Sequence, residues 1–96
     1  MNHFPQSVHV AGHEIKVATH YEMEDWGQFH LDIKTIYISE NAHKEGKAWD
    51  TLRHEMTHAA LQLAGVAFAE RMEEEAIVRC LETIFFPAWD SLKINQ

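Results

Sequence analysis

The sequence predicts an α+β domain: a small sheet of three or four strands, antiparallel or mixed, followed by two helices. Two observations predict this order. Hydrophobic residues alternate with polar ones over much of the first forty residues, as in strands that bury one face. From Lys47 onward they recur at the helical period instead, and the 46% hydrophobic content is enough for a folded core.

The first two strands are expected to form a hairpin. In the stretch VHVAGHEIKV, residues 8–17, hydrophobic and polar residues alternate on both sides of a short turn that contains Gly12. Period-two hydrophobicity around a glycine-bearing turn is the usual signal of a β-hairpin.

Two more strands are expected before the helices. Gly27 breaks an acidic loop and leads into a strand at about residues 28–31. The segment KTIYIS, residues 34–39, is rich in β-branched and aromatic side chains and predicts the last strand.

The first long helix follows these strands. Asn41 is a candidate N-cap, the helical period is clear from Lys47, and Gly65 stands where a helix commonly ends. Its core-facing side is expected to carry Trp49, Leu52, Met56, Ala59, Ala60 and Leu63.

A second helix is expected from Glu70 to Phe86, where Pro87 stops it. Its apolar stripe is centred near Ile77, Leu81 and Ile84. The helix opens with three consecutive glutamates, which complement the positive end of a helix dipole.

Length and charge limit the functional classes. Ninety-six residues predict one domain over residues 1–96, with residues 1–6 as a flexible start. The net charge of −7 and the lack of a basic stripe argue against direct nucleic-acid binding. The single cysteine, the absence of a signal-peptide pattern and the short apolar runs predict a cytoplasmic protein with no role in a membrane.

The segment TLRHEMTHAAL, residues 51–61, contains the pattern H-E-x-x-H. With eight histidines in the chain, chance produces this pattern about 7 times in 100, so its surroundings must decide. On the predicted helix His54 and His58 lie one turn apart, away from the expected core face, where two imidazoles can bind one divalent ion. Glu55 is placed to act on a metal-bound water as general base. Two solvated histidines are the simpler alternative.

A catalytic zinc ion needs a third protein ligand. Leu61 and Ala64 occupy the positions of the glycine and the last histidine in the longer H-E-x-x-H-x-x-G-x-x-H pattern, which excludes it. The acidic run Glu73-Glu74-Glu75 remains. On a helical projection Glu73 and Glu74 flank the apolar stripe and Glu75 points away, so either of the first two is admissible.

These features together resemble a small zincin of the gluzincin type, similar to the metallopeptidase-like proteins related to ImmA/IrrE that are common in phages and prophages. The resemblance covers VHVAGHEIKV, TIYIS, TLRHEMTHAAL and EEEAIVRCLETIFFP. It implies a minimal zincin-like domain with H-E-x-x-H on the first long helix. In the family motif E-x-x-A-N-x-F-A-x-x-L-L-x-P, placing Pro87 on the final proline implies that Glu74 is the third ligand. Ile77-Val78 and Cys80-Leu81 depart from that motif.

The resemblance also implies a substrate site. The strand at residues 36–38 would border the cleft and pair with an extended substrate. Tyr37, His30 and Arg79 are candidates for stabilising the transition state, with no geometric support.

Three hypotheses follow for the function. The first is a zinc-dependent endopeptidase, a hydrolase acting on a protein or peptide: His54, His58 and Glu74 bind Zn²⁺ and Glu55 is catalytic. The second is a zinc-stabilised, catalytically inactive protein-binding module, such as a phage accessory protein. The third is an interaction protein that binds no metal. The oligomeric state is not predicted.

Overall fold

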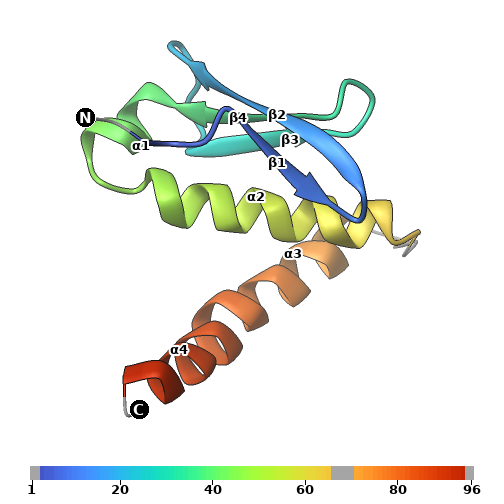
Figure 1. Cartoon of the computed structure of the whole chain (residues 1–96), viewed down its shortest axis with the longest axis vertical. Helices are drawn as coiled ribbons and strands as arrows, with labels where there is room; N and C mark the ends of the chain where they lie inside the picture. The colour runs from blue at the N-terminus through green and yellow to red at the C-terminus, as the bar shows by residue number, and fades with distance from the viewer. Residues whose placement is uncertain (1–2, 66–70, 95–96) are drawn as a thin grey trace. The chain divides into compact units, whose positions relative to one another are not determined.

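The computed structural model describes residues 3–65 and 71–94. The chain divides into two compact units, residues 1–66 and residues 67–96 (Figure 1). The first unit holds the sheet with helices α1 and α2, and the second holds the C-terminal helices. Strands followed by helices confirm the predicted α+β class.

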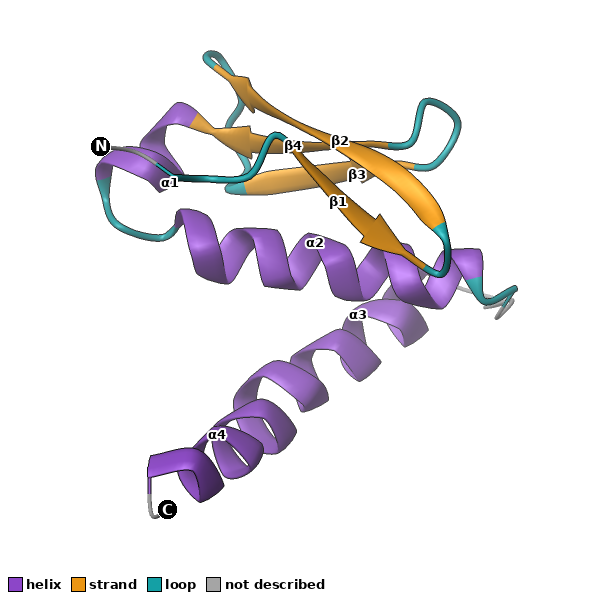
Figure 2. Ribbon diagram, viewed as in Figure 1, coloured by secondary structure: helices purple, strands orange, loops and turns teal. Residues whose placement is uncertain are grey.

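The sheet has four strands and is mixed (Figure 2). They are β1 (Ser7–Val10), β2 (His13–His20), β3 (Gly27–His30) and β4 (Thr35–Ser39). Their spatial order is β1-β2-β4-β3. β1 pairs antiparallel with β2, β4 pairs antiparallel with β3, and the central pair β2 and β4 is parallel.

The predicted hairpin is present as β1 and β2. Ala11 and Gly12 form its two-residue turn, and both have positive φ, 52° and 79°. A two-residue turn with positive φ at both positions matches the right-handed twist of the paired strands, and glycine takes that conformation without strain.

The position of β4 in the sheet corrects one expectation. Residues 36–38 lie in β4, which is hydrogen-bonded to β2 on one side and to β3 on the other. An interior strand has no free backbone groups for an added strand, so the expectation that residues 36–38 pair with a substrate is wrong. Among the strands that the structure describes, β3 lies at this edge of the sheet.

The first helix after the sheet is the short α1 (Glu40–Lys44), and its cap differs from the expected one. The Ser39 hydroxyl accepts a hydrogen bond of 3.0 Å from the backbone N–H of Ala42. Ser39 is the N-cap, and Asn41 lies inside the helix. Gly46, with φ of +71°, then separates α1 from the next helix.

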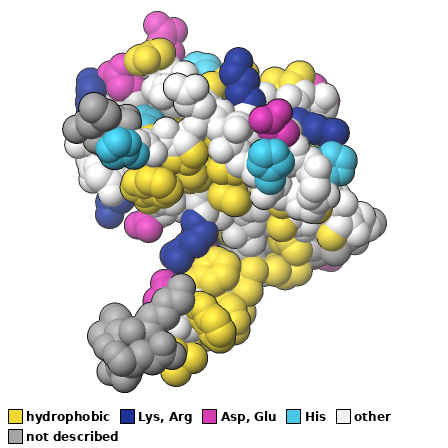
Figure 3. Space-filling model, viewed as in Figure 1, with side chains coloured by type: hydrophobic (Ala, Val, Ile, Leu, Met, Phe, Trp, Pro, Cys, Tyr) yellow, Lys and Arg dark blue, Asp and Glu magenta, His cyan; other side chains and the backbone are white. Residues whose placement is uncertain are grey.

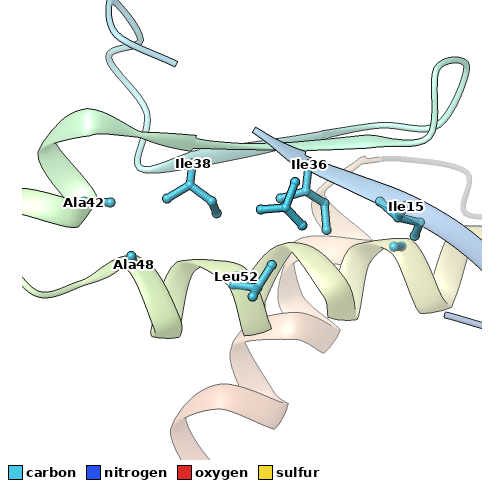
Figure 4. Packing of buried hydrophobic residues seen from close by; sticks show 8 residues of the cluster. Ile15, Ile36, Ile38, Ala42, Ala48 and Leu52 are labelled. Atoms are coloured by element: carbon cyan, nitrogen blue, oxygen red, sulfur yellow. The ribbon is translucent and has the colours of Figure 1, made fainter. Parts of the chain in front are cut away.

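The long helix α2 (Ala48–Leu63) packs on one face of the sheet. The fully buried side chains beneath it are Ile15 from β2 and Ile36 and Ile38 from β4, and Leu52 meets them from α2 (Figure 4). Burying a branched aliphatic side chain of this size stabilises a fold by about 1.5–3 kcal/mol. These contacts fix α2 firmly against the sheet.

The start of the chain also joins this core. Phe4 is half-buried against it, and its ring centroid lies 4.8 Å from that of His43 and 4.9 Å from that of Trp49. Residues 1–6 were expected to be a flexible start; within this segment Phe4 contacts α1 and α2, and residues 1–2 lie outside the described residues.

The second unit contains one continuous helical run. It consists of α3 (Arg71–Cys80), the π-helical turn η1 (Leu81–Phe85) and α4 (Phe86–Ile94). Glu70, the expected first residue, lies outside the described residues. The expectation that Pro87 stops the helix is wrong, because α4 continues to Ile94. In η1 the Phe86 N–H donates a hydrogen bond to the Leu81 carbonyl oxygen, five residues earlier. Such a turn is wider than an α-helical turn, so the ring of Pro87 fits against it with less steric conflict.

Candidate metal centre

The two histidines of the H-E-x-x-H pattern both lie in α2. They are four residues apart, so they project from the same side of the helix on successive turns. The helix is regular from Ala48 to Leu63, and its C-terminal end meets Gly65, which has φ of +78°. A long regular helix packed on a sheet is a rigid support for two ligands.

The imidazole rings of His54 and His58 face each other through the same nitrogen. Their Nε2 atoms are 3.2 Å apart and their ring centroids 4.9 Å apart. As a hydrogen bond, this contact requires one ring to donate an N–H and the other to accept it. Two nitrogens on a tetrahedral zinc ion are about 3.3–3.4 Å apart, given zinc–nitrogen bonds of about 2.0–2.1 Å. The pair is therefore spaced for one shared ion.

The residues of α2 that are buried differ from those expected to face the core. Trp49, expected in the core, is 63% exposed, and Ala60 is exposed as well. Thr51 and Glu55 are buried instead. The expected core face was placed from the hydrophobic residues alone. Polar residues also face the sheet, so the centre of the buried face differs from the expected one.

Glu55 is only 7% exposed, unusual for a carboxylate. It lies where α2 meets β3: a β-carbon placed on Gly27 would come within 3.2 Å of the Glu55 Cγ atom. His58 is nearly as buried, at 8%, and His54 is half-buried. Both histidines were expected to lie away from the core face, but His58 is buried and His54 is half-buried. One buried carboxylate and two imidazoles lie within five residues of one rigid helix.

The third expected ligand, Glu74, belongs to the second unit and lies in the first turn of α3. Glu74 and Glu75 are half-buried and Glu73 is exposed. Val78 is fully buried, and it follows Glu74 by four residues and Glu75 by three, so all three share one side of α3.

The apolar stripe of the second unit also differs from expectation. Ile77 and Ile84 were expected near its centre, but they are 39% and 66% exposed. The buried side of α3 passes through Val78 instead, one position further along the chain. With the buried side centred on Val78, Glu75 lies on the same side of α3 as Glu74. The helical projection of the sequence had placed Glu75 away from that side.

Two candidates for stabilising a transition state are excluded by the register of the sheet. Tyr37 alternates with Ile36 and Ile38, which face α2, so its side chain lies on the opposite face of the sheet. There its ring makes edge contacts with His20 and His30, with centroids 5.7 and 5.3 Å away. Neither Tyr37 nor His30 is on the side of the sheet that carries α2.

Gly27 is the residue of this region that the sequence did not reveal. It appeared only as a break before a strand, yet it begins β3 and lies against α2. The pairing of Gly27 with Ile38 was the missing information, since Ile38 faces α2.

Comparisons with models of protein families, with curated proteins and with solved structures gave no match for this chain. Across residues 3–65 and 71–94, each helix is too short or too polar to cross a lipid bilayer.

Proposed function

We propose that the protein is a small zinc-dependent metallopeptidase of the gluzincin type, related to the ImmA/IrrE-like group, that hydrolyses a peptide bond in the cytoplasm. The observation that supports this proposal best is the pair of Nε2 atoms of His54 and His58, 3.2 Å apart on a helix that also carries the buried Glu55. Their spacing suits a zinc ion, and the position of Glu55 between them in sequence suits a general base.

The third ligand is proposed to be a carboxylate from the start of α3. Glu74 is the first choice, because the family motif anchored at Pro87 assigns it and it shares the buried side of α3 with Val78. Glu75 is the alternative, since it is half-buried and lies on the same side of α3 as Glu74 and Val78. Two imidazoles and one carboxylate are a ligand set found in catalytic zinc sites.

The proposed chemistry assigns a proton to Glu55. When bound, zinc would acidify a water molecule and polarise the peptide carbonyl. Glu55 accepts one proton from that water while the water oxygen adds to the carbonyl carbon. It then delivers the proton to the leaving nitrogen, and the carbon–nitrogen bond breaks. His54 and His58 remain neutral throughout, because only a neutral ring nitrogen can bind the metal.

The substrate is proposed to be an extended segment of a peptide or protein. Among the described strands, β3 pairs on one side only, with β4, and it lies against the part of α2 that holds Glu55. An extended chain can add to such an edge through backbone hydrogen bonds.

A second candidate function is a zinc-stabilised protein-binding module without catalysis. It is favoured by hydrophobic side chains on the second unit, which gather on its visible side in Figure 3. Among the residues of this unit whose burial the structure describes, the large ones that are more than a third exposed are Ile77, Ile84, Phe85, Trp89 and Leu92. Exposed apolar side chains in this number are typical of interaction surfaces.

One experiment separates the two functions. The wild type and the Glu55→Gln variant are incubated with a mixed peptide library, and cleavage products are identified by mass spectrometry with zinc content measured in parallel. The peptidase proposal expects cleavage by the wild type and none by the variant at equal zinc content. Zinc binding without cleavage by either protein would favour the binding module, and absence of zinc from the wild type would exclude both.

A further inference from the structure

The backbone of β3 comes close to α2 at Gly27, beside Glu55. A β-carbon at this position would lie 2.5 Å from the Thr51 Cγ2 atom, 3.1 Å from the Tyr37 carbonyl oxygen and 3.2 Å from the Glu55 Cγ atom. The first distance is far below van der Waals contact, so α2 and a side chain at position 27 cannot both keep their places.

The need for glycine here is a matter of space. The glycines with positive φ are Gly12, Gly46 and Gly65, and Gly27 is not among them. An alanine could adopt the backbone conformation of residue 27, so only the contact with α2 stands against it.

Thr51 and Glu55 are one turn apart on α2, and both are buried. Their side chains therefore stand next to each other in one i, i+4 ridge of the helix, and the bare backbone of Gly27 lies against both of them. A side chain at residue 27 would push on the Thr51 methyl group and on the stem of Glu55 together.

We propose that Gly27 is a positioning residue for Glu55: the missing side chain lets α2 approach β3 closely enough to hold the Glu55 carboxylate in its working place. The role of Glu55 as general base rests on the proposed function, whereas the steric link between Gly27 and Glu55 does not. A displacement of about 1 Å in a catalytic group can lower a rate by about 100-fold.

The test compares Gly27→Ala, Thr51→Ser and the double variant with the wild type. Thr51→Ser removes the methyl group that the new β-carbon would strike and keeps the hydroxyl. We expect Gly27→Ala to lower kcat on a cleaved library peptide by about 10- to 100-fold, with KM within about twofold and zinc content unchanged. Thr51→Ser alone should stay near the wild type, and the double variant should recover most of the lost kcat.

A second readout does not depend on catalysis. The side-chain carboxyl carbons of glutamate are labelled with ¹³C in the purified protein, and the Glu55 resonance is identified by its loss in Glu55→Gln. We expect this resonance to move in Gly27→Ala and to return part of the way in the double variant, where the β-carbon still presses on the Glu55 stem. Failure of the wild type to cleave any peptide would overturn the proposed function and leave this measurement intact.

Two results would contradict a positioning role of Gly27. An unchanged Glu55 resonance in a folded Gly27→Ala variant overturns it, and so does a loss of kcat that Thr51→Ser does not relieve. Where Gly27→Ala does not fold, the double variant is compared with Thr51→Ser alone, and identical Glu55 resonances in those two overturn it equally.

Discussion

The Nε2 atoms of His54 and His58 approach to 3.2 Å across one turn of α2. Two neutral rings hold this position through a single shared proton, whereas a divalent ion can accept a lone pair from both. Both side chains are already partly removed from water, and this adds to the case for metal binding that the spacing makes. Zinc uptake is therefore the first property to measure.

Replacing either histidine should weaken zinc binding strongly. In His54→Ala or His58→Ala, one strong donor is lost, and we expect zinc affinity to fall by more than about 100-fold, beyond the 10- to 100-fold typical for an outer-shell partner. Isothermal titration calorimetry and elemental analysis measure the change. His9→Ala is the matched control, since His9 is exposed on β1, and it should bind zinc like the wild type.

Zinc should also stabilise the folded chain. A ligand that binds only the native state raises the free energy of unfolding, by about 4 kcal/mol when it is present at 1,000 times its Kd. We expect a chelator to lower the thermal midpoint of the wild type and to leave that of His54→Ala unchanged. Equal midpoints for the wild type with and without chelator would contradict zinc binding.

Glu55→Gln should separate binding from catalysis. The amide has nearly the same shape as the carboxylate but cannot take a proton, so kcat should fall by about 10²- to 10⁴-fold at unchanged zinc affinity. Glu45→Gln, at the exposed end of α1, is the control for the charge change. A Glu55→Gln variant with full activity would remove Glu55 from the mechanism.

A scan of the acidic run identifies the third ligand. Glu74→Gln should weaken zinc binding strongly, and Glu73→Gln, at the exposed position, should not. A loss confined to Glu75→Gln would transfer the assignment to Glu75. Zinc affinity retained in all three single variants would exclude this run as the source of the ligand.

The cap of α1 offers a stability test that does not involve the metal. Ser39→Ala removes the acceptor for the Ala42 N–H, and the free energy of unfolding should fall by about 0.5–2 kcal/mol. Asn41→Ala changes an exposed side chain within the helix and should cost less than about 0.5 kcal/mol. Urea denaturation followed by circular dichroism measures both. A larger loss in Asn41→Ala would return the cap to that residue.

Local features of this fold were accessible from the sequence. The hairpin around Gly12 and the strand at residues 35–39 follow from alternation and turn chemistry, which act over a few residues. The end of α2 at Gly65 is local in the same sense, because positive φ there suits glycine. The H-E-x-x-H spacing on a helix needs only the helical period.

Features that depend on distant partners were not accessible. The interior place of β4 depends on β2 and β3 pairing at its two edges, and the sequence of β4 does not encode its neighbours. The orientation of α2 that buries Thr51 and Glu55 depends on the space left by the missing side chain of Gly27. Pro87 was misjudged because the π-helical turn before it makes room that an α-helix lacks.

The pairing of the strands has a consequence for how the chain folds. The sheet consists of two local hairpins, β1–β2 and β3–β4, joined along one parallel seam between β2 and β4. Hairpins of this length close in about 1–10 μs, whereas the seam must bring together segments that a longer stretch of chain separates. We expect the seam, where Val17 lies beside Ile36, to form together with the docking of α2 and to set the folding rate.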